Sequence, residues 1–108
     1  GWRVRVSGLG PGAAHGTVAL RDRSLSTSRA TGAGDEAGPV IDPRTREPVT
    51  QPRIATVLAG DATTADAWST ALIVLGREGL RSLEALDLDW IFEDEAGVER
   101  TRGFPLEH

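Results

Sequence analysis

The stretch from Arg53 to Gly76, RIATVLAGDATTADAWSTALIVLG, decides the fold of this chain. Its first part, RIATVLAG, has apolar residues on both faces and predicts a buried strand. Thr63 or Thr64 can cap the helix that follows, which we expect to run to about Leu75 and to end at Gly76. The stretch therefore predicts a strand followed directly by a helix.

The predicted helix carries a narrow polar stripe. Thr63, Asp66 and Thr70 fall at positions i, i+3 and i+7 among apolar neighbours. A helix that is apolar on nearly every side is normally buried, so we expect Asp66 to be carried inward, where it must meet a cation, a metal or several donors. The alternative is that Asp66 complements the helix dipole in the first turn and Thr70 bonds back to a backbone carbonyl.

The residues before this unit read as strands. WRVRV at residues 2–6 alternates apolar and charged side chains, the pattern of a half-buried strand. TVALRD and SLSTS, at residues 17–22 and 24–28, predict one or two further strands, so the beginning is expected to form an antiparallel meander. Residues 29–53 are rich in glycine and proline and predict a long loop region.

The residues after the main helix predict a short helix around 77–86 and then a hairpin. Its strands are WIFED at 90–94 and VERTR at 98–102, joined through EAG, where Gly97 can take positive φ. The three tryptophans, Trp2, Trp68 and Trp90, each have apolar neighbours and are predicted to lie in the core.

The composition is that of one ordinary domain. Of the 108 residues, 39% are apolar and 26% charged, which allows one modest core. The absence of cysteine excludes disulfides and thiolate zinc sites. The net charge is −4 and the 12 basic residues, all arginine, form no dense cluster, so nucleic-acid binding is disfavoured. The absence of methionine indicates a fragment, and residues 106–108 read like the start of a histidine tag.

Two motifs near the beginning are weak. Gly8, Gly10 and Ala13 match the loose dinucleotide-binding pattern G-x-G-x-x-A, but that pattern needs a helix starting at the glycines, and TVAL predicts a strand instead. A plain turn is therefore the favoured interpretation. His15, without a companion in the same turn, is predicted to be a solvated residue rather than a ligand or a base.

The motif VIDPRT contains an Asp-Pro step at Asp42. The Asp42 carboxylate can accept amide protons two residues on, which is ordinary turn chemistry. Arg44 can either pair with an acidic residue of the fold or bind phosphate through two hydrogen bonds. The residues alone leave both alternatives open.

In combination, these segments resemble the C-terminal third of the ApbE family of FAD:protein FMN transferases, over residues 1 to about 104. Family members read roughly W-x-V-x-I, T-S-G, H-I-I-D-P-R-T-G, A-D-A-x-A-T-A-L-x-V-L-G and a closing G-F. The matching segments here are WRVRV, TSR (27–29), PVIDPRTR (39–46), ADAWSTALIVLG (65–76) and Gly103-Phe104. The resemblance implies one α+β domain over residues 1–105, an antiparallel sheet with one main helix packed on it, as the C-terminal part of an ApbE-like, T-fold-like domain.

The resemblance also implies a site. Asp66 and Thr70 take the place of the family's magnesium ligands, and magnesium suits hard oxygen ligands and substrate phosphates. Near the nucleotide of FAD, the resemblance places Thr27, Ser28, Asp42 and Arg44. The implied reaction moves FMN from FAD to a threonine or serine hydroxyl of an acceptor protein and releases AMP.

Three departures from the family pattern bear on the expected site. The histidine that the family uses as a base is Pro39 here, and proline has no titratable side chain. Asp42 is the candidate substitute for that base. Two family glycines are replaced by Arg29 and Arg46, in loops expected to border the flavin, where arginine adds bulk or backbone strain, or strengthens phosphate binding.

These departures leave two functions open, a magnesium-dependent flavin transferase and a catalytically silent domain that binds FAD, another nucleotide or a protein. The partners implied are FAD, an acceptor protein and the N-terminal portion that in the family supplies most flavin contacts. Many family members are lipid-anchored outside the cytoplasmic membrane, but this sequence carries no signal for its location.

Overall fold

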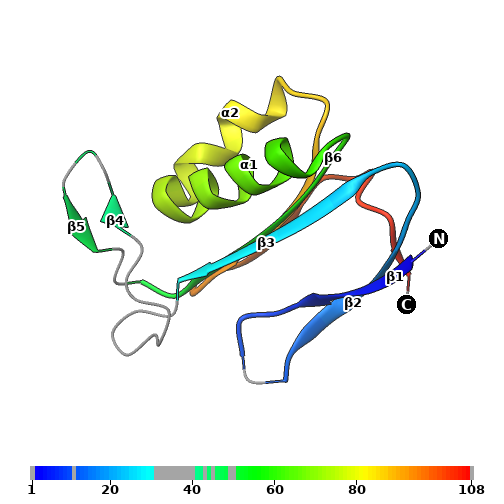
Figure 1. Ribbon diagram of the computed structural model, residues 1–108. Coiled ribbons are helices and arrows are strands. Elements are labelled where there is room, and N and C mark those ends of the chain that lie inside the picture. Colours follow the sequence, from blue (N-terminus) through cyan, green and yellow to red (C-terminus); the bar gives the residue numbers. More distant parts are fainter. Residues whose placement is uncertain are drawn as a thin grey trace.

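The computed structural model (Figure 1) shows three layers, with the helices on one side of a central sheet and a smaller sheet on the other side. The residues that the structure describes are 2–10, 12–30, 41–42, 44, 46–48 and 51–107. The predicted α+β class, with antiparallel strands and one main helix, is confirmed.

The central sheet has four strands in the order β3-β6-β7-β8, and every neighbouring pair is antiparallel. The strands are β3 (Ser24–Ala30), β6 (Arg53–Ala59), β7 (Asp89–Asp94) and β8 (Gly97–Arg100). The last six residues of β6 are all buried, as its two apolar faces predict. The predicted closing hairpin is confirmed, and Gly97 has φ +131°.

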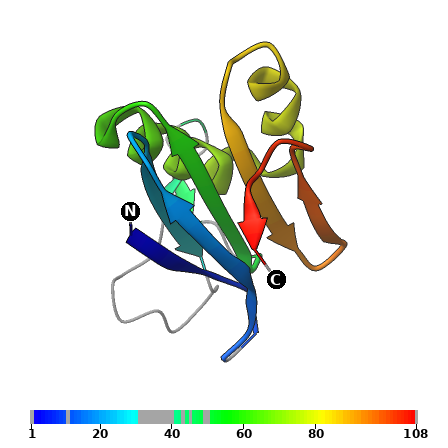
Figure 2. The same ribbon diagram turned by 90° about the vertical axis from the view of Figure 1, so that its right-hand side faces the viewer.

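The second sheet contains β1 (Trp2–Ser7), β2 (Ala14–Leu20) and β9 (Leu106–Glu107), in the order β1-β2-β9 (Figure 2). Its apolar side chains meet the central sheet in a cluster of Val6, Val18, Leu58, Ile91 and Phe104. The prediction that residues 106–108 are a tag remnant concerns their origin and stays a prediction. Leu106 and Glu107 here pair with Val18 and Thr17 of β2.

The predicted meander is wrong at its third strand. β1 and β2 pair as expected, but β3 pairs with β6 in the central sheet. The reason is the alternation along β3, which gives Leu25 to the cluster between the sheets and turns Ser26 towards the helices. Such a strand fits between two layers, since each face has a different neighbour.

The loop predicted over residues 29–53 is also shorter than expected. Arg29 and Ala30 end β3, and a two-stranded ribbon forms from β4 (Ile41–Asp42) and β5 (Glu47–Pro48). Residues 31–40, which include Pro39, lie outside the described part of the chain.

The main helix, α1 (Ala62–Leu75), ends where predicted but begins earlier, because its cap is a different residue. Asp61 accepts the Thr64 backbone N–H at 2.8 Å, which lowers the pKa of the Asp61 carboxyl. Thr64 Oγ1 also donates to Asp61, so neither predicted threonine is the cap. Gly76 ends the helix with φ +67°, as expected.

A short 3₁₀ turn (Gly76–Gly79) and α2 (Leu80–Glu84) follow α1 and complete the helical layer. This layer and the central sheet enclose the main core, which is built from Ala30, Ala55, Val57, Leu72, Ile73, Leu80, Leu83, Trp90 and Phe92. Trp68 packs against it, so the core prediction is confirmed for Trp68 and Trp90. The side chain of Trp2 lies outside the described part.

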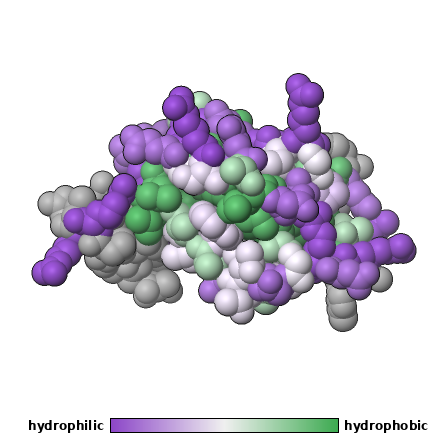
Figure 3. Space-filling view, turned by 90° about the horizontal axis from the view of Figure 1, so that it is seen from above, coloured by the Kyte–Doolittle hydropathy of each residue, from purple (hydrophilic) through white to green (hydrophobic). Residues whose placement is uncertain are grey.

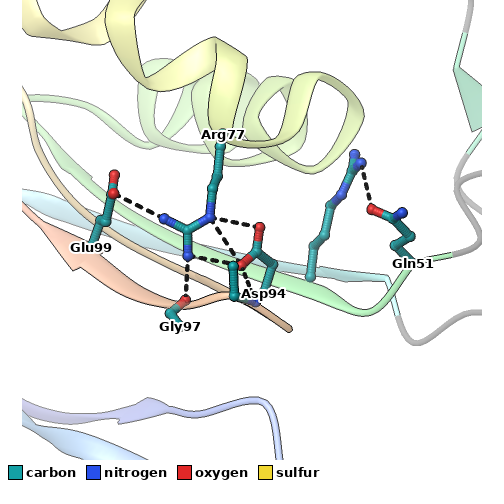
Figure 4. A network of polar contacts seen from close by, with 7 residues as sticks. Gln51, Arg77, Asp94, Gly97 and Glu99 are labelled. Atoms are coloured by element: carbon teal, nitrogen blue, oxygen red, sulfur yellow. Dashed lines mark hydrogen bonds and ion pairs between the residues drawn. The ribbon is translucent and has the colours of Figure 1, made fainter.

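Arg77 fastens the helical layer to the β7–β8 hairpin (Figure 4). Its guanidinium donates to both carboxylate oxygens of Asp94, at 2.8 to 3.0 Å, and to the Gly97 carbonyl at 2.8 Å. Glu99 lies 2.9 Å from the same group, which stands 5.9 Å over the Phe92 ring. The hydrogen bonds from Arg77 hold the pKa of Asp94 below its ordinary value.

None of the helices in the described ranges has the length and apolar character needed to cross a membrane.

Candidate functional site

The polar stripe of α1 faces solvent at the edge of the helical layer. Asp66 and Thr70 are exposed, whereas Ala65, Ser69, Leu72 and Ile73 form the buried side of the helix. The expectation that Asp66 is carried inward is therefore wrong. The outer side of α1 is rich in alanine, and alanine has too little apolar area to require burial. From the helix side, hydrophilic residues surround a central apolar stretch (Figure 3).

The strand β3 brings serine hydroxyls to this stripe. Its residues alternate between the two faces of the sheet, so Ser26 and Ser28 point to α1. Thr27, between them, points to the other face, where its hydroxyl lies 2.8 Å from that of Thr56. Of the two residues predicted near the nucleotide on β3, only Ser28 lies beside Asp66 and Thr70, and the role predicted for Thr27 stays a prediction.

Five oxygen-bearing side chains form what we call the hydroxyl cluster: Ser26, Ser28, Asp66, Ser69 and Thr70. Ser28 Oγ lies 2.8 Å from Ser69 Oγ and 3.3 Å from Thr70 Oγ1. Ser69 Oγ lies 3.2 Å from Ser26 Oγ, which in turn lies 3.4 Å from Asp66 Oδ1. The two predicted metal ligands are thus joined through three serines.

The electrostatics of the cluster favour a cation. Within the part of the chain that the structure describes, no arginine pairs with the Asp66 carboxylate, and its contact with Ser26 is longer than a normal O–H···O bond. The carboxylate therefore retains nearly all its capacity to accept hydrogen bonds or to bind a metal. The oxygen donors here are hard ligands of the kind that Mg²⁺ prefers.

The hydroxyl cluster contains only one charged side chain, that of Asp66. No group of three or more carboxylate or imidazole side chains able to hold a metal occurs among the described residues. A magnesium ion would therefore be held by one carboxylate, hydroxyls, water and phosphate oxygens of a bound substrate, which is the usual coordination of Mg²⁺ at a phosphate site. The side chains present fit that ion, although they do not complete its shell.

Two residues of the VIDPRT motif, Ile41 and Asp42, lie close to the same helix. β4, which contains Asp42, lies beside α1, and Arg44 is exposed in the turn between β4 and β5. The structure describes the backbone of Asp42 but not its side chain. The predicted roles of Asp42 and Arg44 stay predictions.

The two arginines that replace family glycines have different surroundings. Arg29 lies within β3, not in a loop as expected, and its guanidinium donates to the Gly8 carbonyl at 3.0 Å. Arg46 lies in the turn before β5 with φ +59°, a region that favours glycine. The expected backbone strain is therefore present at Arg46.

The weak motifs near the beginning are resolved. The Gly8–Ala13 segment is a turn closed by the hydrogen bond from Gly8 N to Ala13 O (2.8 Å), and β2 follows it, so the plain turn is confirmed. His15 lies in β2 with only 16% of its side chain exposed, which makes the prediction of a solvated residue wrong. Its Nε2 lies 3.1 Å from Glu93 Oε1, too poorly aligned for a hydrogen bond.

Sequence reasoning missed Ser26 and Ser69. The signal for Ser26 was present, because a two-residue period puts it on the same face as Ser28. Ser69 adjoins Thr70 and lies three positions after Asp66, but only the fold shows that its hydroxyl turns towards β3. It also replaces an alanine of the family pattern.

The fold and the cluster define an α+β domain with an oxygen-lined edge between a helix and a strand, a class of site suited to a hard cation. A model of the ApbE family matches residues 1–92, and the chain belongs to this family. Membership in this family indicates a role in flavin transfer. No curated protein and no solved structure matches the chain.

Proposed function

We propose that this chain supplies the magnesium-binding helix of a flavin transferase that moves FMN from FAD to a threonine or serine hydroxyl of an acceptor protein. The observation that carries the proposal is the hydroxyl cluster. Asp66 and Thr70 are exposed on one side of α1 and are surrounded by further hydroxyls, and no described arginine neutralises the carboxylate. Asp66 and Thr70 would hold the metal, and Ser28 lies beside them.

The proposed reaction exchanges the phosphoanhydride linkage of FAD for a phosphoester linkage to the acceptor. The acceptor oxygen forms a bond to the phosphorus on the flavin side of the FAD pyrophosphate, the bond from that phosphorus to the AMP portion breaks, and AMP leaves. When bound, magnesium neutralises charge on the transferring and leaving oxygens. The remaining requirements are positioning of the acceptor and removal of its proton.

The proposed reaction also needs a group that accepts the proton of the attacking hydroxyl. Pro39 stands where the family pattern has histidine, so another group must take the proton. We assign this role to Asp42, three residues later, because β4 places its backbone beside α1. Asp42→Asn is expected to remove transfer, and undiminished transfer by that variant would exclude the assignment.

The proposed function is tested by incubating the protein, in its intact form with any N-terminal portion, with FAD, Mg²⁺ and a Thr/Ser-containing acceptor. Mass spectrometry of the acceptor is expected to show an added FMN and AMP in the solution. Asp66→Ala is expected to abolish this, whereas Thr63→Ala, an exposed threonine in the first turn of the same helix, serves as the matched control. No added mass with the unsubstituted protein contradicts the proposal.

A second candidate is a catalytically silent member that binds FAD or another nucleotide, and Pro39 favours it. The variant Pro39→His distinguishes the two. If the variant transfers FMN and the unsubstituted protein does not, the site is intact and has lost only its base. If the variant remains inactive while FAD still binds, which equilibrium dialysis measures, the chain is a flavin-binding domain.

A further inference from the structure

The hydroxyl cluster contains a chain of hydrogen bonds whose direction is fixed by proton counting. Each of the four hydroxyls has one proton, and an ionised carboxylate can only accept. Asp66 can only accept, so Ser26 is the donor in their 3.4 Å contact, although this contact is longer than an ordinary O–H···O bond. Ser26 then has no proton left for Ser69, so Ser69 donates to Ser26 at 3.2 Å.

The same counting continues to Thr70. Ser69 uses its proton either on Ser26 or on the Asp66 carbonyl, which lies 3.1 Å away, and in both cases it accepts from Ser28 at 2.8 Å. Ser28 has then used its own proton and can only accept from Thr70 at 3.3 Å. The order of donation is Thr70 to Ser28 to Ser69.

This direction decides how Thr70 presents its oxygen. Since Thr70 donates its proton into the cluster, the lone pairs of Oγ1 remain free for a cation. In the opposite direction, Ser28 would donate to Thr70 and occupy one of those lone pairs. Ser69 determines which direction occurs, because it is the acceptor of the Ser28 proton.

We propose that Ser69, which is fully buried and is not one of the proposed metal ligands, is a positioning residue that turns Ser28 and Thr70 so that Thr70 can bind a divalent cation. The inference rests on the proposed function, because it presupposes a cation at Asp66 and Thr70. It adds a residue that the family pattern does not contain, since that pattern has alanine at this position.

The experiment is a calorimetric titration of the full chain with Mg²⁺ alone. Ser69→Ala is expected to weaken binding about tenfold, the lower end of what loss of a residue behind a metal ligand causes. Ser24→Ala is the matched control, because Ser24 lies on the same face of β3 and has no hydrogen bond to the cluster residues. Its affinity is expected to equal that of the unsubstituted chain.

A double-mutant cycle separates positioning from a structural role. If Ser69 acts through Ser28, the double variant Ser69→Ala/Ser28→Ala binds Mg²⁺ about as weakly as the weaker single variant, and Ser28→Thr, which keeps a hydroxyl, restores binding relative to Ser28→Ala. If Ser69 is merely structural, Ser69→Ala lowers the urea midpoint and leaves the Mg²⁺ affinity of the folded protein unchanged, which overturns the inference.

Asp66→Asn separates failure of this inference from failure of the proposed function. If Asp66→Asn loses binding while Ser69→Ala binds like Ser24→Ala, the positioning role is wrong and the metal site stands. If Asp66→Asn binds as tightly as the unsubstituted chain, or if that chain binds no Mg²⁺, the metal site is wrong and the positioning role with it.

Discussion

Arg77 and Asp66 both lie in the helical layer, yet the two charges are used in opposite ways. Arg77 has four partners within 3.0 Å of its guanidinium, on Asp94, Gly97 and Glu99. Among the described residues, the Asp66 carboxylate has one contact, at 3.4 Å, to a serine hydroxyl. A charge that is fully paired within the fold serves the fold, whereas an exposed charge among neutral hydroxyls is available to a ligand. The comparison predicts that substitutions at the two residues affect different properties.

The largest expected effect is the stabilisation that Mg²⁺ brings through Asp66. A ligand that binds only the folded state at a hundred times its Kd stabilises it by about 2.7 kcal/mol. We therefore expect urea unfolding of the full chain to shift by that amount when Mg²⁺ replaces EDTA, and not to shift in Asp66→Asn. Without Mg²⁺, the two proteins are expected to agree within about 0.5 kcal/mol, because Asp66 is exposed.

A clear loss of stability in Asp66→Asn without Mg²⁺ would contradict the difference drawn between Asp66 and Arg77. If Asp66→Asn loses more than about 1 kcal/mol of stability in EDTA, Asp66 serves the fold, as Arg77 does. Ca²⁺ at the same concentration is a useful second ion, because it accepts longer and less regular coordination than Mg²⁺.

The next effect in size is the loss of stability in Arg77→Ala. The substitution leaves Asp94 without its charged partner and removes the bond to the Gly97 carbonyl, so we expect a loss of about 2 kcal/mol. Urea unfolding measures it, and Mg²⁺ affinity is expected to be unchanged. Arg81→Ala, an exposed arginine on the neighbouring α2, is the control. A loss below about 0.5 kcal/mol would show that the ion pairs around Arg77 contribute no more than ordinary surface pairs.

A smaller effect is expected from pH, because protonation weakens only part of the Arg77 network. The pKa of Asp94 is lowered in the folded state by the hydrogen bonds from Arg77, so its contribution is fully present above the unfolded value, about 3.9. The contribution is lost as the pH falls from there through the folded pKa. We expect Asp94→Asn to be less stable at neutral pH and to lose less stability on acidification than the unsubstituted chain.

Asp61 complicates that measurement, because its pKa is also lowered, by the helix-capping bond from Thr64. The double variant Asp61→Asn/Asp94→Asn is therefore the proper reference, and it is expected to show the smallest loss below pH 4 or so. If Asp94→Asn and the unsubstituted chain lose the same amount of stability on acidification, the assignment to Asp94 is contradicted.

The parts of this molecule that the sequence predicts are those set by local chemistry. The end of α1 follows from Gly76, and the closing hairpin follows from Gly97, because these depend on neighbouring residues only. The placement of β3 in the central sheet depends on pairing with β6 across about 30 residues of chain, which no local pattern specifies.

The same distinction explains the candidate site. Asp66 and Thr70 were identified by their spacing and by resemblance, whereas Ser69 became relevant only because β3 lies against α1. The outward direction of Asp66 was missed since alanine fits both an exposed and a buried helix face. The alanine-rich side of α1 therefore gave no reliable indication of its direction.

The smallest effects concern Arg29 and Arg46, which extend the comparison to two further charges. Both replace glycines of the family pattern, but Arg29 has an ordinary strand conformation and a hydrogen bond to Gly8, whereas Arg46 has positive φ. Arg29→Gly is expected to destabilise by about 1 kcal/mol, from the lost bond and the entropy of glycine in a strand. Thermal unfolding measures this, and no loss would show that the bond to Gly8 does not hold in solution.

Arg46→Gly is expected to have the opposite sign. Releasing a side chain from φ +59° recovers roughly 1 kcal/mol, and the greater freedom of glycine in the unfolded chain offsets part of it, which leaves a gain of about 0.5 kcal/mol. Thermal unfolding should show it as a rise of roughly 2 to 4 °C. A gain would show that Arg46 is held at a cost to the fold and that its charge, like that of Asp66, is available to a ligand, here an anionic one such as the FAD pyrophosphate. A loss would place it with Arg77, because the side chain would then stabilise the turn more than its backbone conformation destabilises it.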